Sequence, residues 1–175
     1  MQQVDAQVGP QPDAGAWNAQ GELEVLIFEL GGETFALEAV QVQEIIDLLP
    51  ETAIPGAPAL VGHVINFRGR IVPVADLSLA FGMERAAASA DSRIVVIDLP
   101  LDGEPTLIGL RTDRVHEVAT FAQALAEEVP AVGIRWARQH MRGLVRWRGD
   151  LVVLPDLQAI FLKASHDLGV AAATH

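Results

Sequence analysis

The sequence predicts an all-β fold with short helices, built as two small five-stranded barrels. Short apolar runs dominate the chain, and turn signals separate them. One predicted hairpin also occurs twice, as INFRGRIVPVADL at 65–77 and as the similar VRWRGDLVVLPDL at 145–157. Positions 67–77 and 147–157 share five identities in eleven. Each half spans only ~70 residues, where a core alone is marginal, so we expect the halves to pack against each other.

The first half contains two hairpin signals. Gly31-Gly32 is a strong two-residue turn, and Arg68-Gly69 is the second turn, in which Gly69 supplies the positive φ. Pro73 has no backbone donor, so its run is predicted to be an edge strand or to contain a bulge. The expected strands are 24–30, 33–39, 40–46, 63–67 and 70–74, followed by one or two helical turns at 75–82.

The second half repeats this pattern around Arg148-Gly149. A second match, at an offset of 73 residues, pairs Leu37 with Leu110, Val42 with Val115 and Glu44 with Glu117. Two separate matches in the same order predict an internal duplication. The expected strands are 93–99, 105–111, 113–119, 142–147 and 150–154, with a short helix at 122–129 and a closing helix at 156–165.

The two ends of the chain read as tails. Residues 1–22 are rich in Gln, Ala, Gly, Asp and Pro and are predicted to be flexible, with Trp17 either loose or docked on the body. Residues 83–92 read as a connector. The predicted organisation is one folded unit at 23–163, with barrel subdomains at about 23–82 and 93–163, strand exchange between them allowed, and a second tail at 164–175.

Composition limits the classes of partner. A net charge of −11 and a pI near 4.7 argue against nucleic acid. The absence of cysteine excludes disulfides, thiolate zinc sites and a cysteine nucleophile. With neither a secretory signal nor an apolar stretch of ~18 residues, we expect a cytoplasmic protein without direct membrane insertion. The arginine-rich stretch from Arg135 to Arg148 is either solvated surface or a basic face opposite the acidic first half.

No motif for catalysis or for a cofactor stands out. The five histidines lie at 63, 116, 140, 166 and 175, without metal-ligand spacing, and neither a phosphate-binding loop nor a Gly-x-Ser-x-Gly motif is present. We therefore predict a protein that is not an enzyme and that binds neither metal nor cofactor. Asp76 and Asp156 each follow a repeated hairpin and precede leucine, which is typical of helix N-caps.

A family likeness lies in three segments, FALEAVQVQEII at 35–46, IPGAPALVGHVINFRGRIVPVADLSLAFG at 54–82 and HMRGLVRWRGDLVVLPDLQAIF at 140–161. They resemble the CheW family of bacterial chemotaxis coupling proteins, and the resemblance covers about residues 24–163. It implies two intertwined SH3-like β-barrels that have no enzymatic activity. It also implies an adaptor that joins the cytoplasmic tip of a chemoreceptor to the regulatory domain of the histidine kinase CheA.

The resemblance also implies a receptor-binding site. Its positions here are Val42, Glu44, His63, Asn66, Arg68 and Gly69. Glu44 and Arg68 are expected to face each other. His63 stands where the family usually has glycine, so it either reads a different receptor or fills a gap in the barrel. Contacts to the kinase are expected on an exposed barrel face of the second half, but no residues are assigned to them.

Two other functions remain open at this point. The first is a coupling protein of a related chemosensory pathway that controls pili or second-messenger output. The second is a small-barrel nucleic-acid-binding protein, for which the arginines of 135–148 with Trp136 and Trp147 would supply a basic, aromatic stripe.

Overall fold

The computed structural model describes residues 17–128 and 138–164, and it confirms the all-β class. One six-stranded sheet contains β1 (Glu22–Leu30), β2 (Glu33–Glu38), β9 (Arg114–Ala122), β10 (Ala126–Glu127), β11 (Met141–Trp147) and β12 (Asp150–Pro155). The other contains β3 (Val42–Ile46), β4 (Thr52–Ala53), β5 (His63–Phe67), β6 (Arg70–Ala75), β7 (Arg93–Leu101) and β8 (Glu104–Thr112). The described strands number twelve rather than ten, because the two-residue strands β4 and β10 add one strand to each sheet.

Short helical segments connect the strands. They are α1 (Leu77–Ala80), 3₁₀ turns at Ala39–Gln41, Ala59–Val61, Gln123–Leu125 and Arg138–His140, and a helix at 157–164. The short helix expected at 122–129 is wrong beyond its first turn. Ala126 and Glu127 are extended because they pair with Val145 and Leu144 of β11. The predicted caps are confirmed, since Asp76 Oδ1 accepts from the Ser78 amide at 3.1 Å and Asp156 Oδ1 accepts from the Ala159 amide at 3.0 Å.

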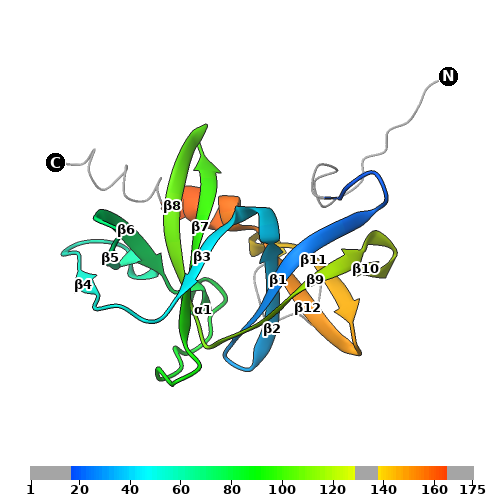
Figure 1. Cartoon of the computed structure of the whole chain (residues 1–175), viewed down its shortest axis with the longest axis horizontal. Coiled ribbons are helices and arrows are strands. Elements are labelled where there is room, and N and C mark those ends of the chain that lie inside the picture. The colour runs from blue at the N-terminus through cyan, green and yellow to red at the C-terminus, as the bar shows by residue number, and fades with distance from the viewer. Residues whose placement is uncertain (1–16, 129–137, 165–175) are drawn as a thin grey trace.

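Each sheet draws strands from both halves of the chain. The hairpin β1–β2 lies beside β12 and β9, which belong to the second half, and the hairpin β7–β8 lies between β3 and β6 of the first half. Figure 1 shows this exchange as the blue hairpin among orange and yellow-green strands, and the green hairpin beside the cyan strands. Segments 23–82 and 93–163 therefore do not correspond one to one with the two sheets.

Three apolar cores explain why the exchanged hairpins are apolar on both faces. In β1, Val25 and Ile27 point into one barrel, whereas Leu26 and Phe28 point into a central core between the barrels. β7 alternates in the same way between the other barrel and the central core. The helix at 157–164 adds Leu157, Ile160 and Phe161 to the central core. The halves thus pack against each other, as their small size predicts.

The environment of Pro73 differs from the sequence expectation. β6 lies between β8 and β5, and its register with β5 shows no bulge. Pro73 pairs with Val64 of β5, while the parallel pairing of β6 with β8 begins at Val74. Pro73 therefore lies where β6 is paired on one side only, so a backbone N–H is not required on the other side.

Trp17 resolves the alternative left open for the N-terminal segment. Its side chain is buried and packs with Leu23, Val25 and Phe121 in the core of the barrel that contains β1. Asn18 closes the following turn, because its Oδ1 accepts from the amides of Gln20 and Glu22 at 2.9 Å each. The indole is thus docked on the body. Residues 1–16 and 165–175 of the two expected tails lie outside the described residues.

Candidate functional site

The first arginine-glycine turn is held in a left-handed conformation at both central residues. Arg68 has φ 52° and Gly69 has φ 78°, the combination that joins strands through a tight two-residue hairpin. Positive φ is costly for an arginine, so surrounding contacts must stabilise it. One such contact is the Gly69 amide, which donates to Asn66 Oδ1 at 2.9 Å. The turn therefore projects the Arg68 side chain from the end of the hairpin β5–β6.

Glu44 of the edge strand β3 receives that side chain. Arg68 Nη2 donates to Glu44 Oε1, and the guanidinium lies over the Phe67 ring at 5.0 Å from its centroid. The side chains remain 70% and 34% exposed, so the pair adds at most ~1 kcal/mol to stability. Its main effect is geometric, because the carboxylate and the ring fix one orientation of the guanidinium. The expectation that Glu44 and Arg68 face each other is confirmed.

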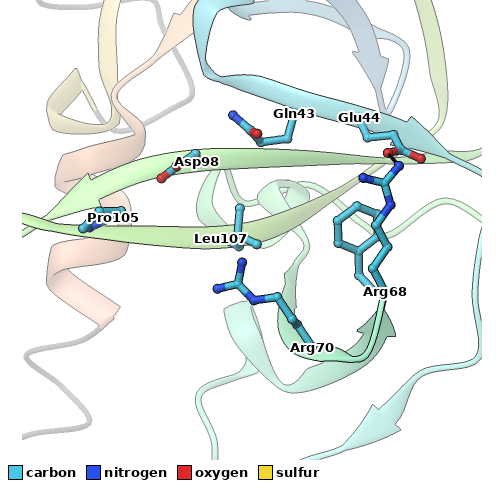
Figure 2. Close-up of a pocket in the computed structure, with 8 residues that line it drawn as sticks. Gln43, Glu44, Arg68, Arg70, Asp98, Pro105 and Leu107 are labelled. Atoms are coloured by element: carbon cyan, nitrogen blue, oxygen red, sulfur yellow. Dashed lines mark hydrogen bonds and ion pairs between the residues drawn. The ribbon is translucent and has the colours of Figure 1, made fainter.

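A pocket of about 310 Å³ opens beside this pair (Figure 2). It is lined by Gln43, Glu44, Phe67, Arg68, Arg70, Asp98, Pro105 and Leu107. Consecutive strand residues normally point to opposite faces, yet Gln43 and Glu44 both line the pocket. The register of β3 against β7 shifts between Val42 and Glu44, so a bulge at Gln43 reorients the strand. This irregularity left no signal in the sequence.

The structure gathers four of the six predicted receptor-binding residues at the tip, namely Glu44, Asn66, Arg68 and Gly69. Val42 is partly buried and packs against the central core, so it supports β3 and does not line the pocket. His63 lies at the opposite end of β5, with Nδ1 4.0 Å from Glu51 Oε1 and its side chain 39% exposed. His63 therefore does not fill a gap in the barrel interior.

An ionic network that sequence reasoning missed lies beside His63. Arg111 of β8 donates from Nε to Glu51 Oε2 at 3.2 Å and from Nη2 to Glu51 Oε1. Its Nη1 also lies 3.7 Å from Asp76 Oδ2. Arg111 and Asp76 are both buried. The network joins the loop before β4, the middle of the sheet and the cap of α1, so its role is to hold this end of the barrel together.

The second arginine-glycine turn reproduces the first. Arg148 has φ 51° and Gly149 has φ 84°. Arg148 Nη2 lies 3.5 Å from Glu117 Oε1, and its guanidinium lies 4.3 Å from the centroid of the Trp147 ring. β9 also carries a register shift next to Glu117, at His116, which is the repeat equivalent of Gln43. The duplication thus extends to the ion pair, the aromatic support and the bulge.

The three arginines of the stretch from Arg135 to Arg148 whose side chains the structure describes are each paired with a glutamate. Arg142, Arg146 and Arg148 pair with Glu38, Glu127 and Glu117, respectively. Each of these acids comes from a distant segment, so the sequence order hides the neutralisation. Arg135 and Trp136 lie outside the described residues.

The strands thus form two SH3-like barrels, each with a braced arginine at a hairpin tip. Among the described residues, no cluster of three or more histidine, aspartate or glutamate side chains is arranged to hold a metal ion. In the same segments, no helix is both long enough and apolar enough to cross a membrane.

The chain belongs to the CheW-like domain family, whose model matches residues 24–165. The probable chemotaxis protein CheW of Rhizobium etli is 30% identical over 148 residues, which cover 85% of this chain and 93% of that protein. A crystal structure of the scaffolding protein TtCheW from Thermoanaerobacter tengcongensis matches with a TM-score of 0.70 and 29% identity, over 79% of this chain and 87% of that one. Protein PilI of Pseudomonas aeruginosa is 30% identical over 104 residues, 59% of this chain and 56% of that protein.

Proposed function

We propose that the protein is a non-enzymatic adaptor that couples chemoreceptors to the histidine kinase CheA in bacterial chemotaxis. The observation that carries the proposal is the CheW-like match over 24–165, supported by relatives that are named chemotaxis protein CheW and by a solved neighbour described as a scaffolding protein. The adaptor acts in the cytoplasm, where the receptor tips and the kinase meet. It uses no metal or cofactor.

The receptor-facing surface is the tip of the hairpin β5–β6 with the edge strand β3. Glu44 and Phe67 hold the Arg68 guanidinium in one orientation, which leaves its remaining N–H groups available to a partner. Asn66 and Gly69 keep the turn that aims it. A receptor helix docked beside the pocket buries apolar contacts against Leu107 and Pro105 while Arg68 fixes its register. Val42 supports this strand from behind.

The kinase-facing surface lies on the barrel that contains β9, β11 and β12. The regulatory domain of CheA consists of similar barrels, as the family resemblance implies, so barrel-to-barrel pairing is the mode we propose. Separate surfaces on separate barrels let one molecule bind both partners at once. That arrangement is what an adaptor requires.

The related chemosensory pathway remains a second candidate because of the relative named Protein PilI. That match spans 59% of this chain, against 85% for the Rhizobium etli protein. The longer match favours the chemotaxis adaptor. Binding to chemotaxis receptors rather than to those of the related pathway distinguishes the two.

The test is co-sedimentation of the purified protein with receptor cytoplasmic fragments and CheA, with kinase autophosphorylation as the functional readout. Arg68→Ala removes one charge-assisted contact, so we expect receptor binding to weaken by about tenfold or more. The melting temperature should stay nearly constant, because the pair is exposed. Arg148→Ala is the matched control, with the same turn outside the pocket. Normal receptor binding by Arg68→Ala, or failure of the wild-type protein to bind receptor or kinase, contradicts the proposal.

A further inference from the structure

The two hairpin tips share almost every feature except one charge. Arg68 and Arg148 occupy equivalent positions, each with a positive φ, an aromatic support and a glutamate partner. The residue after each turn glycine is also equivalent in register, because Arg70 pairs with Phe67 as Asp150 pairs with Trp147. Arg70 is a cation and Asp150 is an anion. The duplication has therefore kept the braced arginine and reversed the charge next to it.

Arg70 is a cation on the wall of the pocket, which is also lined by the carboxylate of Asp98. It is exposed, and within the described residues no carboxylate forms an ion pair with it. Glu44 also lines the pocket, but its carboxylate already accepts a hydrogen bond from Arg68. Figure 2 shows the Arg70 guanidinium pointing toward Leu107, away from the Glu44–Arg68 pair. The pocket thus presents a free guanidinium next to an apolar side chain.

The walls of the pocket limit what can occupy it. Leu107 and Pro105 of β8 supply apolar surface, and Asp98 of β7 is the cross-strand neighbour of Leu107. A volume of about 310 Å³ lies at the small end for ligand sites, so it suits one or two side chains of a docked helix better than a separate molecule. A planar guanidinium matches a carboxylate through two parallel hydrogen bonds. An acidic side chain with an aliphatic stem satisfies both the cation and the apolar patch.

We propose that Arg70 determines the specificity of this pocket, by pairing with a glutamate or aspartate on the receptor's cytoplasmic helices. The inference rests on the proposed receptor-binding function and adds the charge that the receptor must carry at this point. The opposite sign at Asp150 gives the second barrel a different preference. The two equivalent tips then accept different partners although they share one backbone design.

The chain supplies its own exchange experiment. Arg70→Asp gives the first tip the Arg-Gly-Asp sequence of the second, and Asp150→Arg is the reciprocal change. Since the substitution replaces an attraction by a repulsion, we expect Arg70→Asp to weaken binding of a purified receptor cytoplasmic fragment by about 30-fold or more. Asp150→Arg should bind that fragment within about twofold of the wild type. The affinity of Arg70→Gln for the fragment should lie between those of Arg70→Asp and Asp150→Arg. This affinity should also depend less on salt concentration than that of the wild type.

A compensating change identifies the partner group. Acidic residues on the receptor fragment are changed one at a time to lysine, and each fragment is tested against wild type and Arg70→Asp. One of these lysine-substituted fragments should bind the Arg70→Asp adaptor more tightly than it binds the wild-type adaptor. If none restores binding, or if Arg70→Asp binds the original fragment as well as the wild type does, the assignment of Arg70 is overturned.

The outcomes separate this inference from the proposed function. If the wild-type protein binds no receptor fragment, the adaptor function itself fails. If the wild type binds but binding is insensitive to the charge at position 70, only the role of Arg70 fails. Circular dichroism and thermal unfolding of each variant confirm that the fold is retained, which we expect because Arg70 is exposed.

Discussion

The buried arginine of β8 offers the sharpest stability test. Arg111 lies between Glu51 and Asp76, with 11% of its side chain exposed against 16% and 8% for the two acids. Arg111→Ala leaves the nearly buried Glu51 without its arginine, and Asp76 keeps only the exposed Arg85, whose Nε lies 3.7 Å from Asp76 Oδ2. Breaking a buried ion pair by removing one partner typically costs 3–5 kcal/mol, and the residual exposure of Glu51 favours the low end. We expect a loss of about 3 kcal/mol in the free energy of unfolding.

Arg114 provides a matched control three residues away. Its Nη2 donates to Asp91 Oδ2 at 2.7 Å, but the two side chains are 53% and 56% exposed. Arg114→Ala removes the same charge and one ion pair, yet it should cost no more than ~1 kcal/mol, because water already solvates both groups. Both variants replace an ion-paired arginine of the same region by alanine, so the comparison tests the effect of burial.

Urea unfolding followed by circular dichroism measures both values. With an m value of about 2 kcal/mol per molar urea, Arg111→Ala should lower the midpoint by about 1.5 M and Arg114→Ala by at most ~0.5 M. Arg111→Lys keeps the charge but not the two-pronged contact with Glu51, and it should fall between them. Equal midpoints for the two alanine variants would refute the reasoning. If Arg111→Ala cannot be folded at all, the ranking of Arg111→Lys below Arg114→Ala in stability still decides the question.

Two further predictions concern stability. Trp17→Ala should lower the free energy of unfolding by about 3 kcal/mol, because it empties a large buried volume in the barrel that contains β1. Trp17→Phe should retain most of the stability, since no described residue accepts the indole N–H. Thermal unfolding of both variants checks these two expectations. Asp156→Ala should lose about 1 kcal/mol through the missing cap of the helix at 157–164, and Asp156→Asn should not, as measured by the urea midpoint.

The parts of the fold that local chemistry determines were predictable. The turns at Gly31-Gly32 and at the two arginine-glycine tips depend on positive φ, which glycine marks directly in a sequence. The caps at Asp76 and Asp156 depend on a side chain and an amide only two or three residues apart. The same applies to Asn66, which serves the turn that follows it.

The exchange of hairpins was harder to predict, because it depends on which face of a strand meets which core. β1 and β7 each contain four consecutive apolar residues, at 25–28 and 94–97, a pattern typical of strands buried on both faces. That pattern indicates two-sided burial but does not say which barrel receives the strand. The partner acids of Arg111, Arg142 and Arg146 were hidden for a similar reason, since contacts between distant segments leave no spacing signal.

The exchange of hairpins also bears on the proposed adaptor function. Glu44 lies on β3, which is held in place by β7 from the second half, and Glu117 lies on β9, which is held by β1 from the first half. Each glutamate–arginine pair therefore needs strands from both halves before it can form. Neither glutamate–arginine pair is supported by one half alone, and a displacement of either exchanged hairpin shifts the central core that both barrels share. Two tips mounted on one such frame keep a fixed relation to each other, and a coupling between separate binding sites requires that kind of contiguous, packed connection.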